Sequence, residues 1–239
     1  MTGYHKLPRI YTNKNFEFGT LNLERYQAHY LGTVLRKTQG DKIRIFNGAD
    51  GEWLASIDRI SKKECVLNLE QQTRKQAPEK HALHLLFAPV KKVRLDWLIE
   101  KSVELGATHL HPVLTNNTEI RSLKADKIKK QIIEAAEQCE RLSLPELNPL
   151  QLLVPKLGQW PEDIPLYICL ERSDSAHIAK SLVPLEKAAF LIGPEGGFTK
   201  EERAFLSDFR TVSLGPSLMK TETAAIFCLS AFALINQKD

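Results

Sequence analysis

The segment from Ala188 to Phe198 constrains the fold of this chain more than any other. Ala188–Ile192 is an apolar run of the length expected for a buried strand. It ends in a loop that contains Gly193, Pro194, Gly196 and Gly197. Glycine permits sharp turns and lets a ligand lie directly on the backbone. Thr199 and, three residues later, Glu202 form a capping-box pattern, so we expect a helix to begin there and the loop to shape a ligand site.

The chemistry of this loop narrows the choice of ligand. A Walker loop needs Gly-Lys-Ser/Thr, which does not follow Gly197, and a dinucleotide fingerprint needs Gly-x-Gly-x-x-Gly, which is absent. Glu195 would repel a phosphate inside the loop and suits a ligand that carries positive charge. Two alternatives stay open at this point: a tight turn without a ligand, and a nucleotide-dependent enzyme that uses the loop for phosphate.

A second glycine loop follows near the C-terminus. Leu214–Ala225 reads Leu-Gly-Pro-Ser-Leu-Met-Lys-Thr-Glu-Thr-Ala-Ala and comes after a short strand candidate, Thr211–Leu214. The two loops resemble those of the SPOUT class of methyltransferases, and more closely the family of 16S ribosomal RNA uracil N3-methyltransferases (RsmE type). Glu100–Gly106 resembles the Lys-x-x-Glu-Leu-Gly motif of that family, and Glu137–Arg141 resembles its Glu-Gln-x-x-Arg motif.

The resemblance implies an α/β fold with two domains. Residues 73–239 would form a SPOUT methyltransferase domain, a parallel sheet with a trefoil knot, and residues 1–72 a small PUA-like RNA-binding β-barrel. The family binds S-adenosylmethionine, a sulfonium cation without phosphate, and acts as a homodimer. The implied activity is methylation of N3 of a specific uridine in 16S ribosomal RNA of the small subunit.

The resemblance also implies the site residues. Cofactor contacts are expected from Leu170, Ile192, Gly193, Glu195, Gly196, Leu214, Gly215, Leu218, Thr223 and Ala224. We expect Lys220 and Arg141 to surround uracil with positive charge and Glu222 to orient a cation or cap the last helix. RNA contacts are expected from Arg9, Arg36 and Lys101, and no metal is expected.

The chain departs from the family pattern in the second loop and near Asn117. Ser217 and Lys220 stand where the family usually has arginine, and an arginine common around Asn116–Thr118 is missing. Lysine keeps the charge but lacks the planar fork that binds a carbonyl or phosphate in two places. A catalytically impaired SPOUT-like RNA-binding protein is therefore the alternative. Lys101 with Glu104, and Glu137 with Arg141, also have the spacing of simple helix-surface ion pairs.

Hydrophobic periodicity predicts the elements of both domains. In the first we expect a strand at Arg9–Tyr11, a helix over Leu21–Leu35 capped by Thr20, a hairpin of Lys42–Phe46 and Glu52–Ile57, a strand at Cys65–Leu69, and a linker at Gln71–Lys80. In the second we expect strands at Leu83–Ala88, Leu110–Val113, Leu166–Leu170, Ala188–Ile192 and Thr211–Leu214, and helices at Lys92–Leu105, Asp126–Leu142 and Thr221–Ile235. This alternation of strands and helices predicts a parallel sheet.

Composition limits the remaining possibilities. The net charge of +4 permits nucleic-acid binding without indicating it. The longest nearly apolar run, Ala224–Ile235, is too short to cross a bilayer, and the last helix should be covered on every side, by a second subunit. The four cysteines match no metal spacing. We interpret His29, His109 and His111 as structural, and expect a cytoplasmic location.

Overall fold

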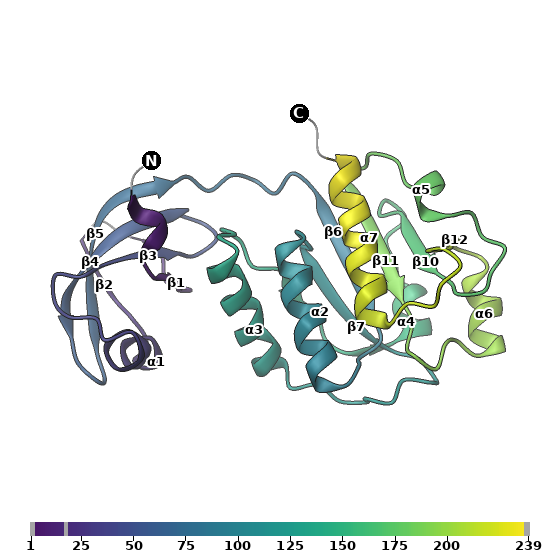
Figure 1. The fold of residues 1–239 in the computed structure, drawn as a ribbon, viewed down its shortest axis with the longest axis horizontal. Helices are drawn as coiled ribbons and strands as arrows, with labels where there is room; N and C mark the ends of the chain where they lie inside the picture. The colour runs from purple at the N-terminus through teal and green to yellow at the C-terminus, as the bar shows by residue number, and fades with distance from the viewer. Residues whose placement is uncertain (1–2, 17–18, 237–239) are drawn as a thin grey trace. The chain divides into compact units, whose positions relative to one another are not determined.

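The chain folds into two compact units in a computed structural model that describes residues 3–16 and 19–236 (Figure 1). The first unit comprises the chain up to Pro78 together with Ala136–Ser143, and the second comprises Glu79–Ala135 and the chain from Leu144 onward. The sequence placed the division after residue 72. The return of residues 136–143 to the first unit is visible only in three dimensions.

The first unit is built around a mostly antiparallel five-stranded sheet with the order β1-β3-β4-β5-β2, in which only β1 and β3 pair in parallel. Its elements are η1 (Gly3–Lys6), β1 (Arg9–Tyr11), β2 (Thr20–Asn22), α1 (Arg25–His29), η2 (Tyr30–Val34), β3 (Lys42–Phe46), β4 (Glu52–Ile60) and β5 (Cys65–Arg74). Its core is aliphatic, with Leu31, Ile43, Ile45 and Leu67 fully buried. The predicted strand at Arg9–Tyr11 and the predicted hairpin are confirmed.

Two predictions in this unit are wrong at their boundaries. Thr20 begins a strand that pairs with β5 instead of capping a helix, and α1 starts at Arg25, where Gln27 Oε1 accepts a hydrogen bond of 2.8 Å from Glu24 N. Strand β5 runs on to Arg74, into the expected linker, because β4 is long enough to pair with it along its length. Long-range pairing thus overrides the polar composition of Gln71–Arg74.

The second unit contains a parallel sheet with the order β12-β10-β11-β6-β7-β8, and β9 also pairs with β7. Its elements are β6 (Ala82–Phe87), α2 (Lys92–Glu104), β7 (His109–Leu114), α3 (Ala125–Gln138, whose last residues group with the first unit), β8 (Glu146–Leu147), β9 (Gln151–Leu152), α4 (Leu153–Leu157), β10 (Leu166–Cys169), α5 (Ile178–Ser181), β11 (Lys187–Ile192), α6 (Lys200–Leu206), β12 (Arg210–Val212) and α7 (Thr221–Asn236). The predicted parallel sheet is confirmed. Helix α3 ends four residues before the predicted Leu142, and Glu140 has a positive φ of 60°, which no helix continues through.

Helices cover both faces of this sheet, which explains why its strands β6, β10 and β11 are buried almost throughout. On one face Phe190 of β11 contacts Phe232 of α7, and on the other Leu191 packs in a cluster with Leu157 of α4 and Leu206 of α6. Helices α2 and α7 lie side by side over the first face (Figure 1). The capping box that begins α6 at Thr199 is formed as predicted.

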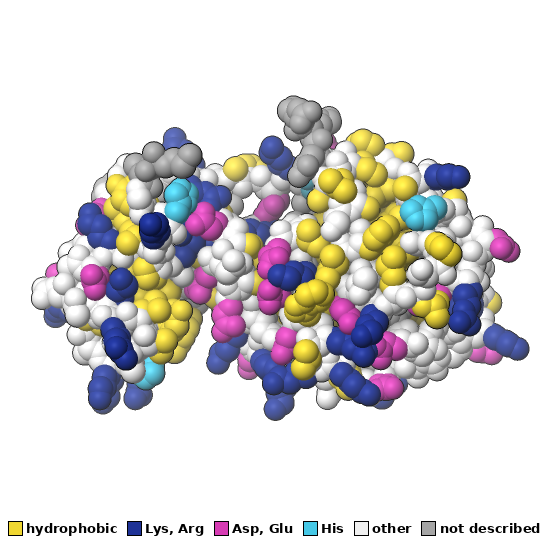
Figure 2. Space-filling model, viewed as in Figure 1, with side chains coloured by type: hydrophobic (Ala, Val, Ile, Leu, Met, Phe, Trp, Pro, Cys, Tyr) yellow, Lys and Arg dark blue, Asp and Glu magenta, His cyan; other side chains and the backbone are white. Residues whose placement is uncertain are grey.

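Helices α2 and α7 leave hydrophobic side chains in solvent. Leu234 and Phe227 of α7 are 70% and 37% exposed, and Val93 and Trp97 of α2 are also exposed. Figure 2 shows hydrophobic side chains gathered over these two helices. The chain by itself therefore does not cover α7 on every side. Among the residues that the structure describes, no helix is long and apolar enough to cross a membrane.

Candidate functional site

A cavity of about 520 Å³ lies at the carboxyl ends of β10, β11 and β12. Because these three strands are parallel neighbours, the loops that follow Cys169, Ile192 and Val212 emerge at one edge of the sheet, where α/β proteins place their ligands. Residues of all three loops and of the first turn of α7 line the cavity. Its volume is that of a small-molecule site.

The cavity brings together most of the residues that the sequence proposed for the cofactor. Those that line it are Leu170, Ile192, Gly193, Glu195, Leu214, Gly215, Leu218 and Ala224. Gly196 and Thr223 are not among the lining residues. Gly196 instead packs on Asn117, whose Nδ2 donates hydrogen bonds of 3.0 Å to the carbonyl oxygens of Gly196 and Gly197.

The first glycine loop is packed too closely at Gly193 to accept a side chain there. A Cβ atom at Gly193 would lie 2.7 Å from the ring of Phe198, which itself lines the cavity. The carbonyl oxygen of Gly193 accepts a hydrogen bond of 3.0 Å from Thr221 Oγ1, which ties the loop to the start of α7. Glu202 Oε1 also accepts a hydrogen bond from Asn116 N, so the loop after β7 is held to α6.

Arg94, which the sequence analysis missed, connects this loop to two helices. Its guanidinium forms an ion pair with Glu195, and its Nε lies 3.8 Å from Glu222 Oε1. Glu222 is 6% exposed, and its Oε2 has no hydrogen-bond partner among the residues that the structure describes. Glu195 lines the cavity, and its ion pair with Arg94 partly neutralises its negative charge. Nothing in the sequence distinguishes Arg94 from other helix-surface arginines.

The three residues proposed for catalysis, Lys220, Glu222 and Arg141, are not among those that line the cavity. Lys220 is exposed and stands between two residues that line the cavity, Met219 and Thr221, without lining it itself. Glu222 lies at the start of α7 with its Oε1 3.8 Å from Arg94 Nε. Arg141 belongs to the first unit, where its Nε donates to Ser143 Oγ at 3.4 Å.

A third loop contributes to the cavity, and only its first residue, Leu170, was expected there from the sequence. Glu171, Arg172 and Ser173 follow β10 and line the cavity beside the two glycine loops. Arg172 has a positive φ of 49°, a conformation rare for residues other than glycine. Arg203 of α6 also lines the cavity, and its Nη1 donates to the carbonyl oxygen of Glu171 at 3.4 Å. The loop contains no glycine, the signal on which the sequence analysis relied.

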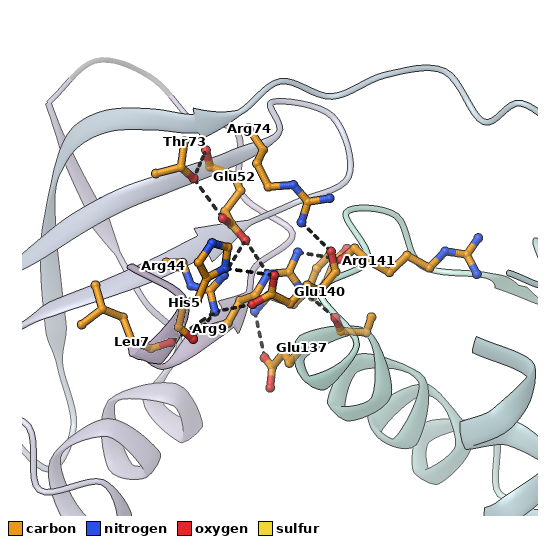
Figure 3. Close-up of polar contacts among 12 residues, drawn as sticks. His5, Leu7, Arg9, Arg44, Glu52, Thr73, Arg74, Glu137, Glu140 and Arg141 are labelled. Atoms are coloured by element: carbon orange, nitrogen blue, oxygen red, sulfur yellow. Dashed lines mark hydrogen bonds and ion pairs between the residues drawn. The ribbon is translucent and has the colours of Figure 1, made fainter. Parts of the chain in front are cut away.

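Arg9, proposed to contact RNA, is buried in the first unit (Figure 3). Its Nε pairs with Glu52 Oε2 at 2.6 Å, and its Nη1 and Nη2 donate to the carbonyl oxygens of Ala136 and Arg141. Arg44 lies beside it and pairs with Glu140 Oε1 at 2.8 Å. Arg9 thus anchors residues 136–143 to the sheet, which is not the exposed position that an RNA contact requires.

The two other residues proposed for RNA differ from each other. Arg36 is exposed, with a positive φ of 53°. Lys101 Nζ lies 2.7 Å from Glu104 Oε1 and 2.8 Å from Glu100 Oε1, and these hydrogen bonds raise the pKa of Lys101. The ion-pair interpretation of Lys101 therefore accounts for its contacts.

Three histidines meet on the sheet of the second unit. His84 Nδ1 lies 3.0 Å from His111 Nε2, and the ring of His109 stacks on that of His84. Burial lowers the pKa of His84 to about 4 and that of His111 to about 3, so both rings are neutral at pH 7. The described residues contain no group of three or more side chains placed to hold a metal ion.

Comparisons with known proteins agree with this architecture. Residues 77–233 match a family model described as an RNA methyltransferase domain, and residues 23–70 match one described as an RNA methyltransferase PUA domain. The ribosomal RNA small subunit methyltransferase E of Rickettsia conorii is 32% identical over 97% of each chain. The protein of the same name from Synechocystis is 31% identical over 88% of this chain and 72% of its own.

Solved structures with the same fold contain a cofactor. A Legionella pneumophila protein described as a methyltransferase, solved with bound SAM, superimposes with a TM-score of 0.86 at 32% identity, over 96% of this chain and 98% of its own. The methyltransferase E of Neisseria gonorrhoeae, bound to S-adenosyl methionine, gives a TM-score of 0.84 at 26% identity, over 94% of this chain and 96% of its own. The matched domains and these relatives show that this chain belongs to the family of ribosomal RNA small subunit methyltransferase E.

Proposed function

We propose that this protein transfers a methyl group from S-adenosylmethionine to N3 of a uridine in 16S ribosomal RNA. The observation that carries the proposal is the cavity at the ends of three parallel strands, lined by both glycine loops. Relatives with the same fold hold this cofactor, and relatives across the whole chain are named for small-subunit RNA. We also propose that residues 1–72 serve as the RNA-binding domain and residues 73–239 as the catalytic domain.

The residues of the cavity fit S-adenosylmethionine better than a phosphate ligand. Leu170, Ile192 and Leu214 supply apolar surface at the strand ends for an adenine ring, and the glycine loops expose backbone groups for its polar atoms. Glu195 adds an acidic group, and the loop has no Walker lysine. When bound, the cofactor supplies a methyl group carried on a sulfonium. After the methyl group is transferred, the rest of the cofactor leaves as a neutral thioether.

The chain must then make N3 of uracil nucleophilic. This nitrogen bears a proton between two carbonyl groups, so the site has to stabilise the anion that forms as the proton leaves. We assign this role to Lys220, which is exposed beside the cavity, with Glu222 and Arg94 close by on α7 and α2. We retain Arg141 as a uracil contact on the strength of the family motif alone. The target base has to be unpaired or flipped to enter the cavity.

Replacing Lys220 with alanine tests the assignment. We expect Lys220→Ala to abolish methyl transfer and to leave S-adenosylmethionine binding, measured by calorimetry, unchanged. Lys180→Ala, which removes another exposed lysine of the second unit, is the matched control and should behave as the wild type. Unchanged turnover of Lys220→Ala would remove Lys220 from the mechanism.

Transfer of labelled methyl from S-adenosylmethionine into small ribosomal subunits of a strain that lacks the protein tests the function itself. Mapping the modified base should locate one N3-methyluridine. Binding of RNA without transfer would favour the catalytically impaired alternative, to which the replacements at Ser217 and Lys220 point. Thermal protection by ATP instead of S-adenosylmethionine would favour the nucleotide-dependent alternative.

We further propose that the protein forms a homodimer through α2 and α7 and acts in the cytoplasm. The exposed hydrophobic side chains of these helices, Val93, Trp97, Phe227 and Leu234, support a second copy as the missing cover of α7. Light scattering should give the mass of a dimer, and Leu234→Asp should give a monomer. The trefoil knot stays a prediction from the resemblance.

A further inference from the structure

Helix α1 and the adjoining η2 present aromatic side chains to solvent. Ala28 and Leu31 point into the core of the first unit and are fully buried. On the opposite side Tyr26 and Tyr30, four residues apart, are 64% and 42% exposed. Val34, a further four residues along, is also exposed. Large exposed side chains in a row are unusual on a soluble surface and indicate a contact with a partner.

Positive charges border these aromatic residues. The turn between β4 and β5 carries Lys62 and Lys63, which lie with Arg25, Tyr26 and His29 around one shallow groove. Within the described residues, none of the three cations, Arg25, Lys62 and Lys63, forms an ion pair with a carboxylate. Figure 2 shows the hydrophobic patch over α1 with Lys and Arg side chains beside it.

One carboxylate also borders the groove, and a neighbouring lysine offsets it. Glu24 Oε1 lies 3.6 Å from Lys14 Nζ. The groove therefore offers flat aromatic surface inside a net positive field. A nucleic acid with unpaired bases matches both features, because its bases stack on aromatic rings while its phosphates pair with cations.

We propose that the groove between α1 and the β4–β5 turn binds a single-stranded segment of RNA, with a base stacked on Tyr26 and phosphates on Lys62 and Lys63. The inference rests on the proposed function and deepens it by naming the RNA-contacting surface of the first unit. It replaces the buried Arg9 with residues that are accessible. Arg36, the exposed arginine that the sequence proposed, follows η2 in the chain.

Fluorescence anisotropy with a labelled single-stranded RNA of about 12 nucleotides tests the groove. We expect Tyr26→Ala to weaken binding about tenfold and Tyr26→Phe, which keeps the ring, to bind like the wild type. Lys62→Ala/Lys63→Ala should reduce the slope of log affinity against log salt by about 1.4, because each single-strand phosphate contact contributes about 0.7. The duplex of the same sequence should be affected less than the single strand.

Lys75→Ala/Lys80→Ala is the matched control, because it removes two exposed lysines from the same chain. An equal loss in this control, or an equal loss for the duplex, would overturn the proposal. The proposal would also be overturned if the groove variants bind naked RNA normally yet fail to methylate assembled subunits. The groove would then contact a ribosomal protein.

Calorimetry with S-adenosylmethionine and the transfer assay separate this proposal from the proposed function. Far-UV circular dichroism equal to that of the wild type shows that the groove variants are folded, and retained cofactor binding shows that the second unit is intact. If the wild type transfers no methyl while the variants lose RNA affinity, the function fails and the groove stands. If the wild type methylates RNA and the groove variants do so with unchanged KM, the groove proposal fails alone.

Discussion

The guanidinium of Arg94, in the first turn of α2, forms an ion pair with the carboxylate of Glu195 in the loop that follows β11. Arg94 Nε also lies 3.8 Å from Glu222 Oε1 at the start of α7. One arginine thus stands between two carboxylates of separate elements, one of which lines the cavity. Without it, Glu195 would be free to move and the buried Glu222 would lose the cation that lies 3.8 Å from its Oε1.

We therefore expect Arg94→Gln to weaken S-adenosylmethionine binding about tenfold, which is ~1.4 kcal/mol. The loss arises because the glycine loop is released and Glu222, a carboxylate that is 6% exposed, loses its neighbouring guanidinium. Arg94→Lys should restore most of the affinity by keeping the charge. Isothermal titration calorimetry measures both.

Arg121→Gln is the control for this substitution, because it removes the same charge from an exposed arginine of the same unit. Its cofactor affinity should equal that of the wild type. Tighter binding by Arg94→Gln would contradict the anchoring role, since it would mean that Arg94 mainly neutralises Glu195 against a cationic ligand.

Gly193→Ala should lower cofactor affinity at least about tenfold. The new Cβ would lie 2.7 Å from the Phe198 ring, so the ring or the loop, both of which line the cavity, would have to shift. Gly158→Ala is the control, because a Cβ there meets only ordinary contacts, the nearest at 3.5 Å. Calorimetry gives the affinities for S-adenosylmethionine. If Gly193→Ala binds the cofactor as tightly as Gly158→Ala, the loop accommodates the added methyl group.

Arg9→Met should lower the free energy of unfolding of the first unit by about 3–5 kcal/mol, the cost of breaking a buried ion pair. Both side chains of the Arg9–Glu52 pair are 2% exposed. Lys42→Met removes the same charge from the partly exposed pair with Glu70 and should cost at most about 1 kcal/mol. Urea unfolding followed by circular dichroism measures both, and similar losses would argue against the buried pair.

Stability should fall as the pH decreases from about 6.5 to about 4. His84 and His111 have pKa values of about 4 and 3 in the folded chain, below the value near 6.5 of an unfolded histidine. The unfolded chain therefore binds protons first, and the stability that is full above pH 6.5 is lost as the pH drops towards the folded values. The loss should reach a few kcal/mol, to order of magnitude.

Thermal unfolding at a series of pH values measures this dependence. His84→Phe/His111→Leu should flatten it. If the double variant keeps the pH dependence of the wild type, groups other than His84 and His111 cause the loss of stability.

Some of the site could be read from the sequence because its signals are local. The apolar run before Gly193 and the Thr199–Glu202 capping box act within a few residues, and both are found in the structure. The second loop was located in the same way by Gly215 and Pro216. The helix start at Arg25 was missed because β2 forms only through its pairing with β5.

Contacts between residues far apart in the chain could not be read in this way. Arg9 looked like a surface arginine, yet its partner Glu52 is 43 residues away. Cys169 and Cys228 matched no spacing, yet their Sγ atoms lie 3.4 Å apart. Each of these pairings depends on which strands and helices become neighbours.

The sequence alone therefore determined the elements, their alternation and the positions of two glycine loops, because hydrophobic periodicity, capping and glycine geometry act over short stretches. Only the tertiary structure decided which charges meet, as with Arg94 and Glu195, and which aromatic residues stay exposed, as with Tyr26. The physical reason is that burial and ion pairing depend on distance in space, which the order of residues does not specify.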